Sequence, residues 1–172
     1  TGSLALGDST ISGTYDIRTR TIAGDITDSG TLDIEGNSSF ITDVAGADIK
    51  LDTTTNGFTG TVTVNTDGSG GDAEIHGGST PLGIIASGGV GTLKLTTIGA
   101  DIIDEGALVV TGATTIDARG AGAAEGADVT LDHGSSDLGG AVGAFGRNIL
   151  LTHPTAIDLG TSTVTGTYGV TA

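Results

Sequence analysis

Internal repetition constrains the fold of this chain more than any other feature of its sequence. Residues 19–36 match residues 95–112 at a shift of 76, with 8 of 18 positions identical. Residues 47–62 match residues 127–142 at a shift of 80, with 6 of 16 positions identical. Fixed periods of this kind are typical of proteins in which small structural units stack on one another.

The C-terminal segment also repeats the N-terminal one. Residues 157–172 match residues 4–19 at a shift of 153, with 7 of 16 positions identical, so the last segment restarts the pattern of the first. We predict a single domain over residues 1–172, built from two half-repeats of about 76 residues, roughly 13–90 and 91–165. Since the chain contains no Met, we expect a processed protein, an excised segment or a part of a longer array.

Short runs of alternating apolar and polar residues recur throughout the chain. This period of two is typical of half-buried strands, and the Gly, Asp, Asn and Ser residues between the runs favour turns. No stretch has the spacing of an amphipathic helix. Pro81 and Pro154 are expected where strands begin, and residues 121–127, rich in Ala and Gly, are expected to form a loop. Examples of predicted strand cores are residues 4–6, 15–17, 32–34, 49–51, 62–64, 93–95, 108–110, 129–131, 149–151 and 157–159.

These features favour an all-β solenoid over other folds built from short strands. A sandwich needs a core about 10 Å thick between its two sheets, and 3 Phe and 2 Tyr residues fill such a core poorly. A solenoid instead stacks the small apolar residues of each turn on those of the turn below. At roughly 20–25 residues a turn, the chain would make about seven or eight turns.

Composition excludes several classes of protein. The 6 Lys and Arg residues face 21 Asp and Glu residues, so the net charge of −15 repels nucleic acid and anionic membranes. No apolar run has the roughly 20 residues that a membrane-spanning helix needs. Without Cys the chain has no disulfide, no Cys-ligated metal and no thiol nucleophile. We therefore expect no nucleic-acid partner and no insertion into membranes.

The two ends of the predicted solenoid are candidate interaction surfaces. A solenoid without caps exposes unpaired strand edges and apolar side chains, which template association. The strand pattern begins at once at the N-terminus and runs to the C-terminus with no capping signal. The sequence therefore predicts a head-to-tail homopolymer, which is an open filament. The residues predicted to form these self-association surfaces are Leu4, Leu6, Ile11, Tyr15, Ile17, Ile157, Leu159, Val164, Tyr168 and Val170.

Several segments resemble the repeats of filamentous-haemagglutinin-type adhesins. They are GTLKLTTIGADIIDEGALVVTGATTIDARG (91–120), ADVTLDHGSSDLGGAV (127–142) and AIDLGTSTVTGTYGVTA (156–172), and ADIKLDTTTNGFTGTV (47–62) shows the same pattern in the first half. Such repeats fill very large bacterial surface and secreted adhesins. The resemblance implies a right-handed parallel β-helix, a location outside the cell or on the bacterial cell surface, and a role as stalk, adhesin or matrix component.

Motifs that would point to catalysis or metal binding are weak. Asp104 and Glu105 form the one adjacent acid pair, but a glycoside hydrolase needs two carboxylates across a cleft. The three His residues share no metal-ligand spacing. Residues 67–78 are acidic and Gly-rich but miss the repeated calcium-binding nonapeptide, so a flexible surface loop is the simpler interpretation. We expect no cofactor, no catalytic residue and no specific metal site, with diffuse binding of divalent cations by the acidic surface.

The sequence therefore favours a non-enzymatic, extracellular structural protein whose β-helical units stack head to tail in a surface or matrix filament. One alternative is a stalk or binding segment of a giant covalent adhesin, which would engage a receptor or a glycan. A further alternative is a carbohydrate-active enzyme on a β-helix. A charge at Leu4, Leu159 or Val170 would disrupt filament seams, whereas a binding module would depend on a loop such as residues 67–78 and an enzyme on paired carboxylates.

Overall fold

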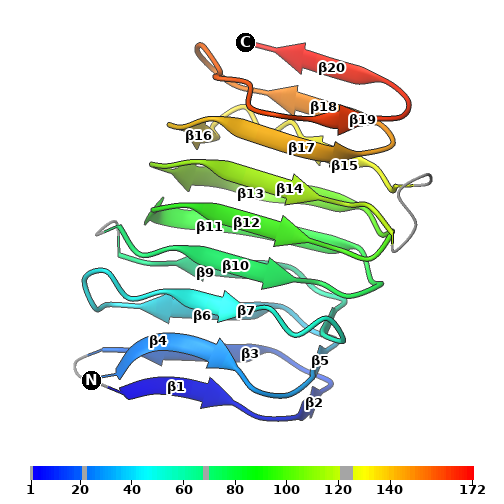
Figure 1. The fold of residues 1–172 in the computed structure, drawn as a ribbon. Coiled ribbons are helices and arrows are strands. Elements are labelled where there is room, and N and C mark those ends of the chain that lie inside the picture. The colour runs from blue at the N-terminus through cyan, green and yellow to red at the C-terminus, as the bar shows by residue number, and fades with distance from the viewer. Residues whose placement is uncertain (1, 21–22, 68–69, 121–125) are drawn as a thin grey trace.

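The computed structural model is a β-solenoid of about seven turns, in which parallel strands stack along one axis (Figure 1). It describes residues 2–20, 23–67, 70–120 and 126–172. These residues contain strands and turns but no helix. The N-terminus lies at one end of the stack and the C-terminus at the other (Figure 1). The all-β solenoid predicted from the sequence is therefore confirmed.

Three parallel sheets run along the axis, and each strand lies beside a strand of the previous or the next turn. The A sheet contains, in spatial order, β1 (Gly2–Leu6), β4 (Ala23–Asp28), β7 (Ile49–Leu51), β10 (Ala73–His76), β12 (Leu93–Thr96), β14 (Thr114–Asp117), β17 (Val142–Gly146) and β19 (Thr163–Val164). The C sheet contains β3 (Tyr15–Thr19), β6 (Ser38–Thr42), β9 (Val62–Asn65), β11 (Leu82–Val90), β13 (Ile102–Val110), β15 (Val129–Leu131), β18 (Ile149–Thr152) and β20 (Tyr168–Thr171), with β16 (Asp137–Leu138) beside β13. The short B sheet contains β2 (Ser9–Ile11), β5 (Leu32–Ile34) and β8 (Gly57–Phe58).

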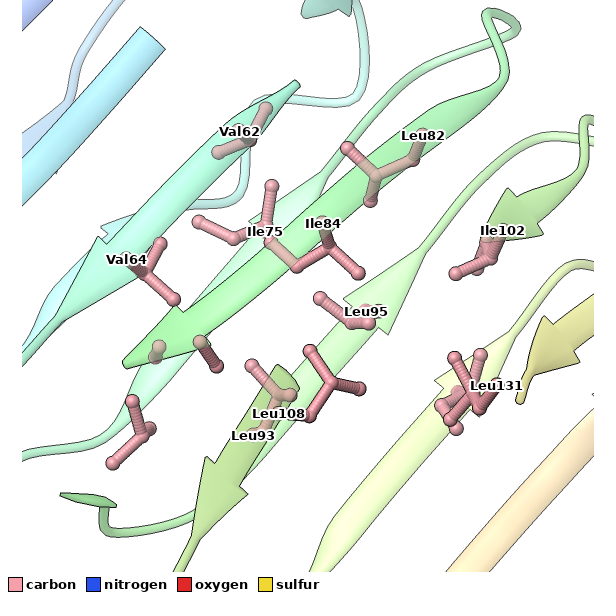
Figure 2. Packing of buried hydrophobic residues seen from close by; sticks show 14 of the residues in the cluster. Val62, Val64, Ile75, Leu82, Ile84, Leu93, Leu95, Ile102, Leu108 and Leu131 are labelled. Carbon is pink, nitrogen blue, oxygen red and sulfur yellow. The ribbon is translucent and has the colours of Figure 1, made fainter. Parts of the chain in front are cut away.

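Inward-facing side chains of each turn stack on those of the next and form the core. In the A sheet, Ile49 lies opposite Ile26, and Leu95 lies between Ile75 and Ile116. All five side chains are fully buried. Figure 2 shows buried side chains from the A and C sheets gathered between the two sheets. Because burial of apolar surface contributes about 25 cal/mol per Å², this continuous column is the main source of stability.

Corresponding residues of the two half-repeats lie on opposite sheets. Ile26 in the A sheet corresponds to Ile102 in the C sheet, whereas Val62 in the C sheet corresponds to Val142 in the A sheet. The shift of 76 to 80 residues therefore spans three turns and about half of another. The shift of 153 residues instead spans a whole number of turns, because Tyr15 and its counterpart Tyr168 both begin strands of the C sheet.

Because of this half-turn offset, the strand segments that connect the two large sheets lie on one edge of the solenoid in the first half and on the opposite edge in the second half. In the first half, the chain passes from the A sheet to the C sheet through β2, β5 and β8 and returns through connections without strands. In the second half, it returns from the C sheet to the A sheet through the ends of β11 and β13 and through β16. The opposite edge is then crossed by short turns such as residues 97–101.

Stacked glycines precede strands of the C sheet in the first half of the chain and strands of the A sheet in the second half. Gly13, Gly36 and Gly60 lie one above another before strands of the C sheet, while Gly112 and Gly140 lie before strands of the A sheet. A Cβ atom at Gly36 would lie 2.4 Å from the carbonyl oxygen of Gly13, and one at Gly140 would lie 2.5 Å from the carbonyl carbon of Gly112. Only Gly allows the backbones of successive turns to approach so closely.

Most of the predicted strands are present. All of the predicted strand cores except residues 157–159 lie in strands, and in that segment only Leu159 makes an isolated bridge, to Val142. Pro81 immediately precedes β11, as predicted. The prediction for Pro154 is wrong, because β18 ends before it and Pro154 lies in a bend rather than at the start of a strand.

Two predicted loops have different outcomes. Of the loop predicted at residues 121–127, residues 121–125 lie outside the described residues. The flexible surface loop predicted at residues 67–78 is wrong in part, because β10 lies within it and buries Ala73 and Ile75 in the core. This strand is only four residues long and lies between Gly-rich segments, which hid its period of two.

Candidate interaction surfaces at the two ends

The first and the last turn of the solenoid leave strand edges without a partner. We call residues 2–19, which contain β1, β2 and β3, the first coil, and residues 157–171, which contain β19 and β20, the last coil. Each of these five strands stands at the end of its sheet among the described residues and pairs with a single neighbouring strand. Such edges carry rows of free N–H and C=O groups and therefore template pairing with a further strand.

Apolar side chains that are buried in the inner turns are exposed in these two coils. Leu4 is 37% exposed, although its partner Ile26 in the second turn is fully buried. Val170 is 38% exposed, although its partner Leu151 is 1% exposed. Of the predicted self-association residues, Leu4, Leu159, Tyr168 and Val170 are exposed, Ile11, Tyr15, Ile17, Ile157 and Val164 are partly buried against the core, and Leu6 is buried.

The structure thus gathers these residues into two sets at opposite ends of the axis. The set in the first coil and the set in the last coil occupy the two extremes of the stack in Figure 1. Leu6 belongs to the buried core, and Ile11, Tyr15, Ile17, Ile157 and Val164 pack against it. Their role in self-association stays a prediction.

The second coil, residues 23–42, covers the first coil within the same chain. It contains β4, β5 and β6, which pair with β1, β2 and β3. Ile17 lies opposite Phe40. The ring of Tyr15 meets the ring of Phe40 edge to face, with 6.1 Å between the ring centroids, a favourable geometry for an aromatic pair. The apolar end of the first coil therefore has a matching partner within the same chain.

Polar contacts also join the first coil to the turn above it. Arg18 donates from Nε to Oδ2 of Asp43 at 2.7 Å and from Nη2 to Oδ1 at 2.8 Å. This hydrogen bonding to Arg18 lowers the pKa of the Asp43 carboxyl and raises the pKa of Arg18. Oδ1 of Asp8 accepts the backbone N–H of Thr31 at 2.8 Å.

Asp side chains tie successive turns together along both large sheets. Along the A sheet, Oδ1 of Asp25 in β4 accepts the N–H of Asp48 at 3.0 Å, and Oδ1 of Asp48 accepts the N–H of Asp72 at 2.8 Å. Before strands of the C sheet, Oδ1 of Asp101 accepts the N–H of Asp128 at 2.9 Å. This ladder was not predicted, although the matching Asp residues of the two half-repeats were an available signal in the sequence.

These carboxylates do not form a metal centre. The described part of the chain contains no group of three or more Asp, Glu or His side chains that could hold a metal ion. Asp128 instead accepts hydrogen bonds from Arg147 and Asn148, and hydrogen bonding to Arg147 lowers the pKa of the Asp128 carboxyl. Diffuse binding of divalent cations stays a prediction. No helix in the described residues is long and apolar enough to span a bilayer.

The adjacent acids Asp104 and Glu105 point to opposite faces of β13. Asp104 is buried, and its Oδ1 and Oδ2 accept the N–H groups of Asp132 and His133, both at 3.0 Å. Burial raises the pKa of the Asp104 carboxyl, and the two backbone hydrogen bonds only partly offset this effect. Glu105 is exposed on the outer face. The pair therefore does not present two carboxylates across one cleft.

The His residues bind backbone groups in separate turns. Nε2 of His153, which is 5% exposed, accepts the N–H of Leu138 at 3.0 Å. Nδ1 of His76 accepts the N–H of Gly78 at 3.0 Å, and burial lowers the pKa of His76, followed in effect by the charge of Lys94. Both imidazoles thus act as acceptors that hold the ends of strands and turns.

Comparison with known proteins identifies one family. The family model described as repeats of unknown function (DUF5649) matches residues 1–65 and 70–144. The two matched segments correspond approximately to the two halves of the chain. Neither a curated protein nor a solved structure shows significant similarity to the chain.

Proposed function

We propose a structural role for this chain, which belongs to the family of repeats of unknown function (DUF5649). In this proposal the protein is a non-enzymatic element whose solenoid units join end to end in a filament outside the bacterial cell or on its surface. The observation that carries the proposal is the state of the two ends. Both expose apolar side chains and unpaired strand edges, and the two end coils are versions of one sequence.

Strand pairing and apolar burial would drive the assembly. A strand added to the C sheet at β20 finds free backbone groups along one side of that strand. Covering Leu159, Tyr168 and Val170 removes apolar surface from water, which contributes about 25 cal/mol per Å². Because the two surfaces lie at opposite ends of one axis, their contact does not close into a ring and extends as a filament.

The net charge supports a filament that remains dispersed in solution. With a formal charge of −15, the flanks of neighbouring filaments repel one another, and salt weakens this repulsion. Exposed large apolar residues also lie away from the ends, at Ile98, Ile103 and Leu150. Among the described residues, the end coils combine such residues with unpaired strand edges, and this combination favours association at the ends.

A second candidate is a stalk or binding segment of a giant covalent adhesin that engages a receptor or a glycan. The repeat family and the resemblance to filamentous-haemagglutinin-type repeats favour it, since a longer array would cover the same end surfaces covalently. The location outside the cell rests on the same resemblance. We place a carbohydrate-active enzyme third, because Asp104 is engaged by backbone N–H groups of the next turn.

Electron microscopy of the purified chain tests the filament. We expect rods longer than one chain, with an axial repeat of about 30–38 Å set by strands about 4.8 Å apart. Val170→Asp should abolish them, because it places a charge on the exposed end of the core. Ile103→Asp is the matched control, since Ile103 is similarly exposed, at 37%, but lies on the flank of the C sheet. Single short rods at all concentrations would contradict the proposal and favour the adhesin segment.

A further inference from the structure

We propose that the last coil of one copy takes the place of the first coil of another copy. Residues 157–171 would pack on the second coil of the next chain, residues 23–42, and displace residues 2–19 of that chain. This inference rests on the proposed function and names the partner surface: a second copy of the same chain, opened at its first turn.

The first and last coils match in sequence and in the position of their C-sheet strands. They match at a shift of 153 residues, with 7 of 16 positions identical. Because this shift is a whole number of turns, Tyr15 and Tyr168 both begin strands of the C sheet. The two coils differ in their second strands, because residues 10–11 lie in β2 of the B sheet, whereas the matching residues 163–164 lie in β19 of the A sheet.

The last coil has counterparts of the first-coil residues that contact Phe40 and Gly36 of the second coil. Tyr168 would replace Tyr15 against the ring of Phe40, and Val170 would replace Ile17 in the same position. Gly36 of the second coil lets the coil below approach closely, because a Cβ added at Gly36 would meet the carbonyl oxygen of Gly13 at 2.4 Å, whereas nothing lies within 4 Å of a Cβ added at Gly13. The last coil has Gly166 at the position of Gly13, so its backbone would approach Gly36 in the same way.

Two contacts hold the first coil in its own chain and are absent from the last coil. Arg18, which binds Asp43, corresponds to Thr171. Asp8, which accepts the N–H of Thr31, corresponds to Thr161. The resident first coil therefore has a polar advantage, and the exchange depends on the concentration of the incoming chain.

Exchange places turns next to each other in a combination that has a counterpart within the chain, whereas simple stacking does not. After exchange, the last coil lies between the turn that precedes it and a second coil, in the position of the first coil. In simple stacking, a last coil would instead lie directly on a first coil, and no such pair of turns is adjacent among the described residues. The second coil is also the one surface whose fit to this type of coil is seen, in β3 against β6 and β2 against β5.

Pairs of engineered Cys residues distinguish the two arrangements. Asp16 lies opposite Ser39 in the parallel pair of β3 and β6, and Gly169 corresponds to Asp16 in the last coil. Facing residues of neighbouring strands lie about 4.8 Å apart, within the Cα separation that a disulfide spans. Ser39→Cys with Gly169→Cys reports exchange, and Asp16→Cys with Gly169→Cys reports simple stacking. Asp16→Cys with Ser39→Cys is the control, which should close within one chain.

We expect the Ser39→Cys and Gly169→Cys chain to form a series of disulfide-linked multimers on a non-reducing gel after mild oxidation at high concentration. A comparable or greater yield from the Asp16→Cys and Gly169→Cys chain would overturn exchange but leave the proposed filament intact. If neither pair links chains while the control pair closes, both exchange and the filament are wrong.

A matched pair of charge substitutions gives a second readout. Val170→Asp should abolish multimers, because Val170 belongs to the incoming coil. Ile17→Asp, at the equivalent position, should leave multimers at least as abundant as in the unmodified chain, because it weakens only the coil that is displaced. Equal loss of multimers in both variants, measured by sedimentation, would overturn exchange in favour of stacking.

Discussion

The two halves of the molecule carry the same sequence signals on opposite sheets. Asp28 is the last residue of β4 in the A sheet and accepts the N–H groups of Asp52 and Thr53, at 3.1 and 3.2 Å. Its counterpart Asp104 lies in the C sheet and binds the next turn in the same way. The repeats therefore encode a local arrangement of strand, turn and capping side chain that works equally well on either sheet.

The difference between the halves shows what decides which sheet each copy of the repeat occupies. In the first half, Asn56 in the turn before β8 accepts the N–H of Leu32 through Oδ1 at 2.8 Å. In the second half, Ser136 in the turn before β16 accepts the N–H of Leu108 through Oγ at 3.1 Å. The same support thus builds the short strand on one edge and then on the other. The opposite edge is crossed by a shorter connection. Each half-repeat therefore spans three turns of the solenoid and about half of another.

The largest expected loss of stability comes from substitutions in the glycine stacks. Gly60→Ala and Gly140→Ala should each lower the free energy of unfolding by about 3 kcal/mol, because the new Cβ would overlap the backbone of the turn below. Urea unfolding measures the loss. Gly134→Ala is the control and should be nearly neutral, since nothing lies within 4 Å of its Cβ position. A loss confined to one half would show that the two stacks are not equivalent.

The two side chains that accept an N–H in the turn below the short strands, Asn56 and Ser136, should contribute different amounts of stability to the two halves. Asn56→Ala removes the acceptor of Leu32 and the donor that reaches Oδ2 of Asp28 at 2.6 Å, so we expect a loss of about 2 kcal/mol. Ser136→Ala removes only the acceptor of Leu108, and we expect about 1 kcal/mol. Thermal unfolding of both variants checks the order. The reverse order would mean that the second half depends more on its cap than the first.

Asp104 should make stability depend on pH. Burial raises the pKa of this carboxyl, so the folded chain holds a proton more tightly than the unfolded chain does. Stability should therefore fall as pH rises from the usual carboxyl range through the raised pKa of Asp104. Asp104→Asn should show a shallower decline in that window when the urea midpoint is measured against pH. An unchanged slope would assign the pH dependence to other groups.

The smallest expected effect compares the two Asp ladders. Asp48→Asn keeps an oxygen to accept the N–H of Asp72, so its stability should be almost unchanged. Asp128→Asn also weakens the ion pair with Arg147, which is largely exposed, and should cost slightly more at low salt. The difference between the variants should disappear in concentrated salt, as measured by thermal unfolding. A difference that persists there would indicate a role for Asp128 beyond the ion pair.

Much of the fold follows from local sequence, and the errors have local causes. The alternating runs located all predicted strand cores but one, because inward and outward residues alternate in a strand whichever sheet it joins. β10 was missed because its four residues lie between Gly-rich segments. Residues 157–159 look like residues 4–6, yet only Leu159 forms a bridge. The Asp ladder could have been inferred from the repeats, but its hydrogen bonds link residues in different turns.

The sequence by itself determined the repeat, the strands, the stacking of turns and the placement of the glycines that stacking requires. Only the tertiary structure decided which sheet each copy occupies and that Asp104 faces inward while Glu105 faces out. The physical reason is that sequence similarity records the local environment of a residue, and this environment is nearly the same in both large sheets. Which sheet a copy occupies depends on how many residues cross each edge, and hydrogen bonds between turns, such as that from the N–H of Leu32 to Asn56, hold these crossings in place.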